Sequence, residues 1–181
     1  KFPLLPSNLK QLGIYSLNIP EYFIFPSSLK ELVLSSVRLS SFHFLSQLTH
    51  LEILQLFHVN GWQDEYQLLP NSLQSFSITS DSLDLKNFSR LPSSLKTLYF
   101  DLMLKRDYNI EDLQRLPTSI KNLSILQDKM IDALFLKSLP TQLVYLSLKG
   151  DVFSLKDVCT FPDSLRGLSL DLHLVERWVS L

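Results

Sequence analysis

The sequence is poor in the residues that form cross-links, phosphate loops and metal sites. It contains one cysteine, Cys159, and four glycines, and its four histidines show no spacing typical of metal ligands. A single cysteine excludes an internal disulfide framework and is compatible with a reducing compartment. With so few glycines there is no G-x-x-x-x-G-K loop for a nucleotide phosphate. We therefore expect neither a cofactor nor a metal.

The chain also lacks an excess of charge and a long apolar run. Its formal net charge is -1, which provides no long-range positive field for nucleic acid or anionic membrane. Polar residues interrupt every leucine-rich segment well before the roughly 18 apolar residues that span a bilayer. The opening residues KFPLLPSNLK show no signal peptide. These features predict an intracellular protein, cytoplasmic or nuclear, whose partner is neither nucleic acid nor membrane.

Convergent catalytic groups are missing as well. The lone thiol of Cys159 follows Asp157 in the segment DVCTFP, and a neighbouring carboxylate disfavours the reactive thiolate. No other cluster of nucleophile and base is visible, so we expect that the chain is not an enzyme. A pocket with two or more titratable groups within hydrogen-bonding reach would be needed to support an enzyme module.

What the chain does contain is a phrase that returns at nearly constant intervals. The pattern P-x-S-L-x-x-L-x-L, with small variations, occurs seven times, and an eighth copy, THLEILQL at 49–56, lacks the proline. The opening apolar residues lie 20 to 25 residues apart and are Leu9, Leu29, Leu51, Leu73, Leu95, Ile120, Leu143 and Leu165. Such a period is typical of a solenoid whose repeats pack only on their neighbours.

Two local structures compete for this phrase. The segment SSLKTL could start a capped helix, because serine is a good N-cap and leucines three apart share a helical face. However, the apolar spacing then changes from three to two, at Leu95, Leu98 and Phe100. A strand places the last two side chains on one face, whereas a helix separates them. Each phrase therefore predicts a short strand, preceded by a proline that interrupts helix.

The spacing L-x-x-L-x-L at a period near 22 residues resembles the leucine-rich repeat superfamily over essentially the whole chain. The Pro-x-Ser-Leu opening is similar to the FNIP-type repeats of amoebal proteins and, more loosely, to the LPx-type repeats of bacterial effector ubiquitin ligases. The resemblance implies a single α/β solenoid domain over residues 1–181 with about eight repeats. Its expected shape is a horseshoe or arc, with a parallel β-sheet on the concave face and short helical or irregular convex segments.

One column departs from the usual repeat. Typical leucine-rich repeats place Asn or Cys three residues after the final apolar position, where the side chain satisfies backbone groups in a tight turn. Here that column reads Leu17, Val37, Val59, Asp81, Met103, Asp128, Asp151 and His173. Apolar side chains can form no such hydrogen bonds, so we expect irregular turns after the strands.

The residues between the inward leucines should form the concave face. Its central column is small or polar in six of eight repeats, and aromatic residues stand out from this polar floor. Such residues are typical anchors of protein interfaces, although each tyrosine could instead pack only against its cross-strand neighbours. The candidate partner-binding residues are Tyr15, Phe57, Tyr99, Asp101, Tyr145, Lys149 and Asp171.

A second column, directly after the first leucine of each phrase, is basic in five of eight repeats. Its basic members are Lys10, Lys30, Lys96, Lys121 and Arg166. Strands about 4.8 Å apart would arrange them as a broken positive stripe along one rim. The stripe could steer an acidic partner, or it could simply keep the edge soluble.

The segments between phrases have apolar residues at spacings of three and four, which predicts one or two helical turns on the convex side. The longest step contains the charged insertion DLMLKRDYNIEDLQRLP, and solenoid insertions map to loops. Lys105, Arg106 and Tyr108 are therefore secondary candidates for contact with a partner. The terminal segment HLVERWVSL has a helical stripe at 174–181 that predicts either a capping helix or the convex segment of a further repeat.

These observations predict a noncatalytic protein-protein recognition module. By resemblance, its expected role is an intracellular adaptor or substrate receptor, for example the recognition part of a ubiquitin-ligase component, with further domains of the same protein outside this chain. An extracellular or cell-surface recognition domain is the alternative and would use the same face. Neither end shows a polar cap, so we expect the chain to be part of a longer protein.

Overall fold

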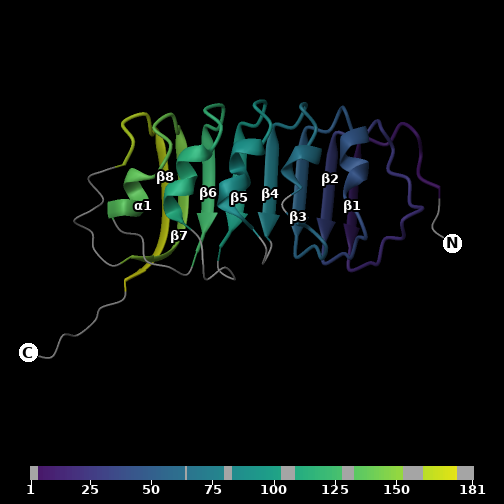
Figure 1. Cartoon of the computed structure of the whole chain (residues 1–181), viewed down its shortest axis with the longest axis horizontal. Helices are drawn as coiled ribbons and strands as arrows, with labels where there is room; N and C mark the ends of the chain where they lie inside the picture. The colour runs from purple at the N-terminus through teal and green to yellow at the C-terminus, as the bar shows by residue number, and fades with distance from the viewer. Residues whose placement is uncertain are drawn as a thin grey trace, which may run out of the picture.

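The computed structural model describes residues 4–63, 65–79, 83–102, 109–127, 133–152 and 161–174. Eight strands form one open parallel sheet in which every strand pairs with its neighbours in sequence order (Figure 1). The strands are β1 (Gln11–Tyr15), β2 (Glu31–Ser35), β3 (Ile53–Phe57), β4 (Ser75–Thr79), β5 (Thr97–Asp101), β6 (Asn122–Leu126), β7 (Tyr145–Val152) and β8 (Gly167–Leu174). This arrangement confirms the predicted solenoid, with β1 and β8 at opposite ends of the row.

A tight turn precedes almost every strand, and the Pro-x-Ser-Leu phrase forms it. The leucine N–H donates to the proline carbonyl, at 3.2 Å from Leu29 to Pro26 and at 3.1 Å from Leu95 to Pro92. Proline suits the first position because that residue contributes only its carbonyl to the turn. The residue that closes the turn is fully buried in the middle repeats, as at Leu29 and Leu95, and partly buried at Leu9 and Leu165. The turn therefore places the first core residue of the repeat just before its strand begins.

In four repeats the serine of the phrase joins the repeat to the one before it, whereas the buried Ser119 hydroxyl of the sixth repeat has no hydrogen-bond partner in the described part of the chain. In those four repeats the serine hydroxyl donates to the backbone carbonyl of the preceding repeat's opening leucine. Three of these bonds are 2.7 Å long and run from Ser28 to Leu9, from Ser72 to Leu51, and from Ser94 to Leu73. Ser164 donates in the same way to Leu143. The motif therefore encodes a serine ladder along the edge where the strands begin.

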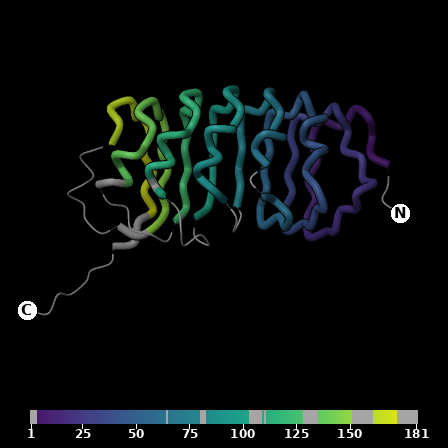
Figure 2. The backbone as a smooth tube through the Cα atoms, viewed as in Figure 1, coloured from purple at the N-terminus to yellow at the C-terminus, as the bar shows by residue number. Residues whose placement is uncertain are grey.

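Short helical turns connect the strands on the far side of the core, as predicted. They are η1 (His43–Gln47), η2 (Tyr66–Leu68), η3 (Leu85–Arg90), η4 (Ile110–Arg115) and α1 (Ala133–Lys137). The first four are 3-10 helices and only α1 is an α-helix. The backbone therefore makes one coil for each repeat, which Figure 2 shows as successive loops of the tube.

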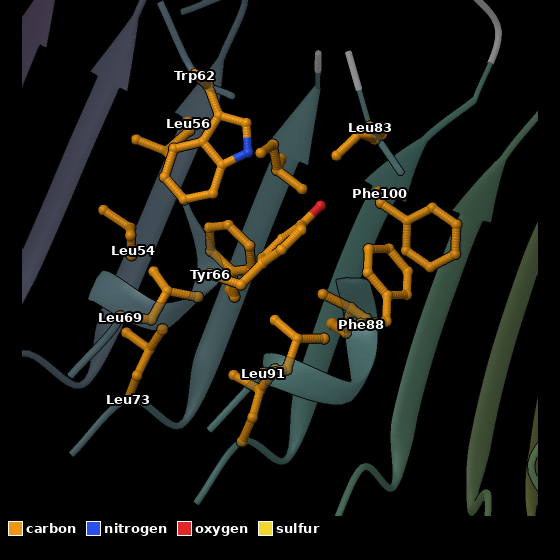
Figure 3. Packing of buried hydrophobic residues seen from close by; sticks show 14 of the residues in the cluster. Leu54, Leu56, Trp62, Tyr66, Leu69, Leu73, Leu83, Phe88, Leu91 and Phe100 are labelled. Atoms are coloured by element: carbon orange, nitrogen blue, oxygen red, sulfur yellow. The ribbon is translucent and has the colours of Figure 1, made fainter. Parts of the chain in front are cut away.

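The core lies between the sheet and these helical turns. Leucines fill it at most positions, and aromatic rings from successive repeats contact one another through its centre (Figure 3). Trp62 meets Tyr66 with ring centroids 5.6 Å apart, Tyr66 meets Phe88 at 5.6 Å, and Phe88 meets Phe100 at 5.1 Å, all in edge-to-face geometry. Edge-to-face contacts are favourable for aromatic rings, so the rings bind repeats three to five together.

The turns after the first three strands are regular, which corrects the expectation of irregularity there. Ser16, Ser36 and His58 follow β1, β2 and β3 with φ of 52°, 54° and 51°. Backbone groups of the next repeat then satisfy the turn. Arg38 N–H donates to the Leu17 carbonyl at 3.2 Å, and Asn60 N–H donates to the Val37 carbonyl at 3.0 Å.

The apolar residues in this column therefore need no side-chain hydrogen bond. Val37 is completely buried, and Val59 is 7% exposed, so these side chains extend the core instead. At the other end of the sheet the same stretch continues as strand, because β7 and β8 each have eight residues. The turns thus differ along the solenoid, but in the first three repeats they share one geometry.

The helical stripe predicted at 174–181 overlaps the end of the last strand by one residue. Leu174 is the last residue of β8 and pairs with Val152, so the stripe's first residue belongs to a strand. A strand continues there because β7 provides an equally long partner. The other residues of the stripe, Val175, Trp178 and Leu181, lie outside the described residues.

Candidate functional site

The sheet has one face that no other element covers in the described part of the chain. Its side chains come from the first, third and fifth residues of each strand, and the parallel register aligns them in three columns. The first column is Gln11, Glu31, Ile53, Ser75, Thr97, Asn122, Tyr145 and Gly167; the central column is Gly13, Val33, Gln55, Ser77, Tyr99, Ser124, Ser147 and Ser169; the third column is Tyr15, Ser35, Phe57, Thr79, Asp101, Leu126, Lys149 and Asp171. We call this surface the open face.

Two of the candidate aromatic residues meet on the open face. Phe57 ends β3 and Tyr99 lies at the centre of β5, yet their ring centroids are 6.5 Å apart at an interplanar angle of 70°. Thr79 lies between them on β4 and is only 7% exposed, which is consistent with the two rings covering it. Both rings remain half-buried, so each still presents apolar area to solvent.

Charged side chains flank this aromatic pair on the side of the later repeats. Lys149 and Asp171 form an ion pair at 2.9 Å between β7 and β8. The hydrogen bond that Lys149 donates to the Asp171 carboxylate, and the negative charge of that carboxylate, raise the pKa of Lys149. Burial raises the pKa of the Tyr99 hydroxyl, the Asp101 carboxylate raises it further, and the Lys149 ammonium opposes both effects. The Tyr99 hydroxyl therefore lies close enough to Asp101 and Lys149 for both charges to affect its pKa.

The other two tyrosines lie apart from this cluster. Tyr15 is 65% exposed and lies over Gly13, where an added Cβ would come within 2.9 Å of the ring. Tyr145 is 42% exposed and lies over Gly167, its cross-strand neighbour, where an added Cβ would come within 2.6 Å. Each ring thus covers a glycine that has no side chain of its own. Tyr145 fits the cross-strand packing alternative, whereas Tyr15 covers a glycine of its own strand.

The structure therefore brings together five of the seven candidate residues and separates two. Phe57, Tyr99 and Asp101 lie on β3 and β5, and the pair of Lys149 and Asp171 extends the cluster to β7 and β8. Tyr15 shares the third column but lies at its far end on β1, two strands from Phe57, and Tyr145 on β7 belongs to the first column. The secondary candidates Lys105, Arg106 and Tyr108 lie outside the described residues, as does Cys159.

Three apolar residues of the open face were not among the candidates. Val33, Ile53 and Leu126 occupy outward positions of β2, β3 and β6 and are half-buried. Leu126 pairs with Asp101 in the register, and Ile53 lies on the same strand as Phe57. An apolar residue in an otherwise polar outward column was the pattern that could have identified them.

The described residues give no support to other kinds of site. They contain no group of three or more His, Cys, Asp or Glu side chains that could hold a metal. In the same part of the chain no helix is both long and apolar enough to cross a bilayer. The open face has hydroxyls, amides, four aromatic rings and an ion pair, which are groups typical of contact surfaces.

The fold is similar to solved structures of leucine-rich-repeat proteins. An internalin C2 of Listeria monocytogenes matches with a TM-score of 0.61 and 21% identity, over 93% of this chain and 74% of that one. An internalin encoded as inlF in the same organism matches with a TM-score of 0.56 and 16% identity, over 93% of this chain and 56% of that one. CroV588, a circular leucine-rich-repeat protein, matches with a TM-score of 0.57 and 22% identity, over 94% of this chain and 25% of that one.

The chain thus spans about half the length of the inlF internalin and a quarter of CroV588. Its sequence matches no protein-family model and no curated protein. The sequential parallel sheet and the structural likeness agree with the repeat found in the sequence. The chain has the fold of the leucine-rich-repeat proteins.

Proposed function

We propose that the chain is a noncatalytic protein-recognition module that binds a protein partner on the open face, the concave face expected from the sequence. The observation that carries the proposal is the contact between Phe57 and Tyr99, with ring centroids 6.5 Å apart on a face otherwise rich in hydroxyls. Large aromatic side chains dominate the energetics of protein interfaces because they bury much area at little cost in entropy.

The surroundings of the pair fit the anatomy of an interface. Half-buried Ile53 and Leu126 add apolar area near the aromatic rings. The ion pair of Lys149 and Asp171 is well exposed and lies toward one end, so it resembles the polar rim that surrounds an apolar centre. Serines at 77, 124, 147 and 169 occupy the central column of the face, and their polar side chains are much shorter than the aromatic rings.

The specific role that we propose is an intracellular adaptor or substrate receptor, for example the recognition part of a ubiquitin-ligase component. The resemblance of the Pro-x-Ser-Leu opening and the single cysteine support this form of the proposal. It includes a second module outside residues 1–181 that acts on the bound protein. An extracellular or cell-surface receptor would use the same open face, so the test below applies to both.

The proposal is tested by affinity capture from the native cell extract with the full-length protein. The parent is compared with the double variant Phe57→Ala/Tyr99→Ala, and bound proteins are identified by mass spectrometry. We expect at least one protein to be recovered by the parent and lost by the variant. Identical protein profiles from both baits, with the variant folded by circular dichroism, would overturn the proposal.

A further inference from the structure

Basic side chains line the edge of the sheet where the strands begin, and we call this edge the amino-terminal rim. Its basic members are Lys10, Lys30, Lys96, Lys121 and Arg166, each exposed and each directly preceding a strand. Because the sheet is parallel, the starts of all strands meet at one edge, with neighbours about 4.8 Å apart. The rim is a surface distinct from the open face.

The backbone of the rim has few free acceptors that would repel an anion. The carbonyl of Gln74 accepts from the N–H groups of Lys96 and Thr97 at 2.9 and 3.0 Å. The carbonyl of Lys96 likewise accepts from Lys121 and Asn122 at 2.9 and 3.0 Å. The same pair of hydrogen bonds to one carbonyl oxygen recurs from repeat to repeat. Backbone oxygens along the rim are thus occupied, while the side-chain ammonium groups project outward.

The charge of the rim is uneven. Lys30 is neutralised by Glu52, with its Nζ 2.7 Å from the carboxylate. Lys96 and Lys121 form no ion pair within the described ranges. The strand residues beside them, Thr97 and Asn122, are neutral and hydrogen-bond to each other at 3.2 Å. Lys10 and Arg166 have no ion pair in these ranges either, but they lie at the starts of β1 and β8, whereas Lys96 and Lys121 are unpaired neighbours at the starts of β5 and β6.

A polar hollow of about 420 Å³ adjoins this charge at repeats two to five. His50, Asn71, Gln74 and Lys96 line it, together with the pair of Lys30 and Glu52. All of these except Glu52 can donate hydrogen bonds, and Glu52 is already engaged by Lys30. The hollow and the two free lysines together form a continuous surface rich in donors.

We propose that the amino-terminal rim binds an acidic peptide segment, with carboxylates held by Lys96 and Lys121 and by the donors of the hollow. Lysine and amide donors match carboxylate acceptors in charge and in hydrogen bonding. A nucleic-acid strand fits less well, because the hollow has no Phe, Tyr or Trp ring on which bases could stack. The balanced charge of the whole chain, -1, also provides no broad positive field.

The test measures binding of fluorescein-labelled octaglutamate to the full chain by fluorescence anisotropy. The experiment starts at about 10 mM salt, where the Debye length is roughly 30 Å, and is repeated near 0.15 M. We expect saturable binding that weakens with salt, and a loss of affinity of about tenfold or more in the variant Lys96→Glu/Lys121→Glu. A neutral serine-glycine peptide of the same length should not bind.

The matched control is Lys86→Glu/Arg90→Glu, which makes the same change in net charge at exposed positions of η3 on the other side of the core. We expect this variant to keep octaglutamate affinity within about twofold at 0.15 M salt, because exposed charges farther apart than the Debye length of about 8 Å are then largely screened. Equal weakening in both variants at 0.15 M salt, no octaglutamate binding at low salt, or tighter binding of an oligothymidylate of equal charge would each overturn the proposal. The rim variant leaves Phe57 and Tyr99 intact, so this test and the capture experiment fail independently.

Discussion

At the scale of single residues, the serine of the repeated phrase explains how this solenoid holds its repeats together. The usual asparagine column is replaced by residues such as Val37 that are buried in the core. The serine hydroxyls instead bond to the preceding repeat at the opposite edge of the sheet, 2.7 Å from the acceptor at three repeats. In the usual repeat a side chain bonds to the neighbouring repeat after the strand, whereas here the serine does so before the strand.

Replacing a ladder serine should destabilise the fold by more than replacing its neighbour. Ser94→Ala removes the hydrogen bond to the Leu73 carbonyl, and we expect a loss of about 1 kcal/mol in the free energy of unfolding. Ser93→Ala, in the same turn but exposed, should change it by less than about 0.5 kcal/mol. Urea denaturation of both variants measures the difference, and equal midpoints would refute the ladder's contribution.

Removing each of the two charges beside the Tyr99 hydroxyl should change its pKa in opposite directions. Its pKa is raised by burial and by Asp101 and lowered by Lys149. Asp101→Asn removes a negative charge that disfavours tyrosinate, so the pKa of Tyr99 should fall. Lys149→Gln removes a positive charge that favours tyrosinate, so the pKa should rise.

The measurement is a pH titration of the Tyr99 ring carbon signals by NMR, assigned with the variant Tyr99→Phe. Shifts of the same sign in the two variants would contradict the arrangement of Asp101 and Lys149 around this hydroxyl.

At the scale of elements, the sequence predicted the strands and the helical turns well because their patterns are local. The change of apolar spacing from three to two located the strands at Leu98 and Phe100, and both side chains are buried. Spacings of three and four located the short helices. The turns after the strands were not predicted, because their left-handed residues are Ser16, Ser36 and His58 rather than the usual glycine or asparagine.

The turn after β3 gives an element-scale test. Gly61 has φ of 99°, and an added Cβ would lie 2.5 Å from the Leu39 carbonyl oxygen of the preceding repeat. In Gly61→Ala the alanine would have an unfavourable positive φ, and its Cβ would clash with the Leu39 carbonyl oxygen. We therefore expect the substitution to lower the free energy of unfolding by at least about 1 kcal/mol.

The matched control for this turn is Gly13→Ala in β1. Gly13 has no positive φ, and the nearest atoms belong to the movable ring of Tyr15. We expect a change of less than about 0.5 kcal/mol by thermal or urea unfolding. If Gly61→Ala costs no more stability than Gly13→Ala, the close approach of Gly61 to the Leu39 carbonyl would be refuted.

At the scale of the whole molecule, the repeat defined the candidate site only in part. Aligning the eight phrases was enough to identify which residues face outward, because side chains alternate along a strand. The alignment could not show that Phe57 and Tyr99 meet across β4, since that contact depends on side-chain directions over a small intervening Thr79. Nor could it show that Tyr15 and Tyr145 lie over glycines.

The molecule as a whole presents two surfaces with different chemistry. The open face combines an aromatic pair with the ion pair of Lys149 and Asp171. The amino-terminal rim has two adjacent lysines, Lys96 and Lys121, without an ion pair in the described part of the chain. A protein partner with an apolar patch and an acidic segment could contact both surfaces, and affinity from two linked contacts can exceed that of either one.

The central claim, binding through the open face, is tested most directly by the dissociation constant of the captured partner. It should be measured by calorimetry for the full-length parent, for Phe57→Ala/Tyr99→Ala, and for the control Tyr22→Ala/Ile24→Ala. The control removes two exposed apolar side chains, 72% and 79% exposed, from the segment between β1 and β2.

The account predicts that the open-face variant binds more weakly by about 1 to 4 kcal/mol, which is about five-fold to several hundred-fold in the dissociation constant, while the control keeps the parent's affinity. Parent-like affinity in a folded open-face variant, or an equal loss in the control, would contradict it.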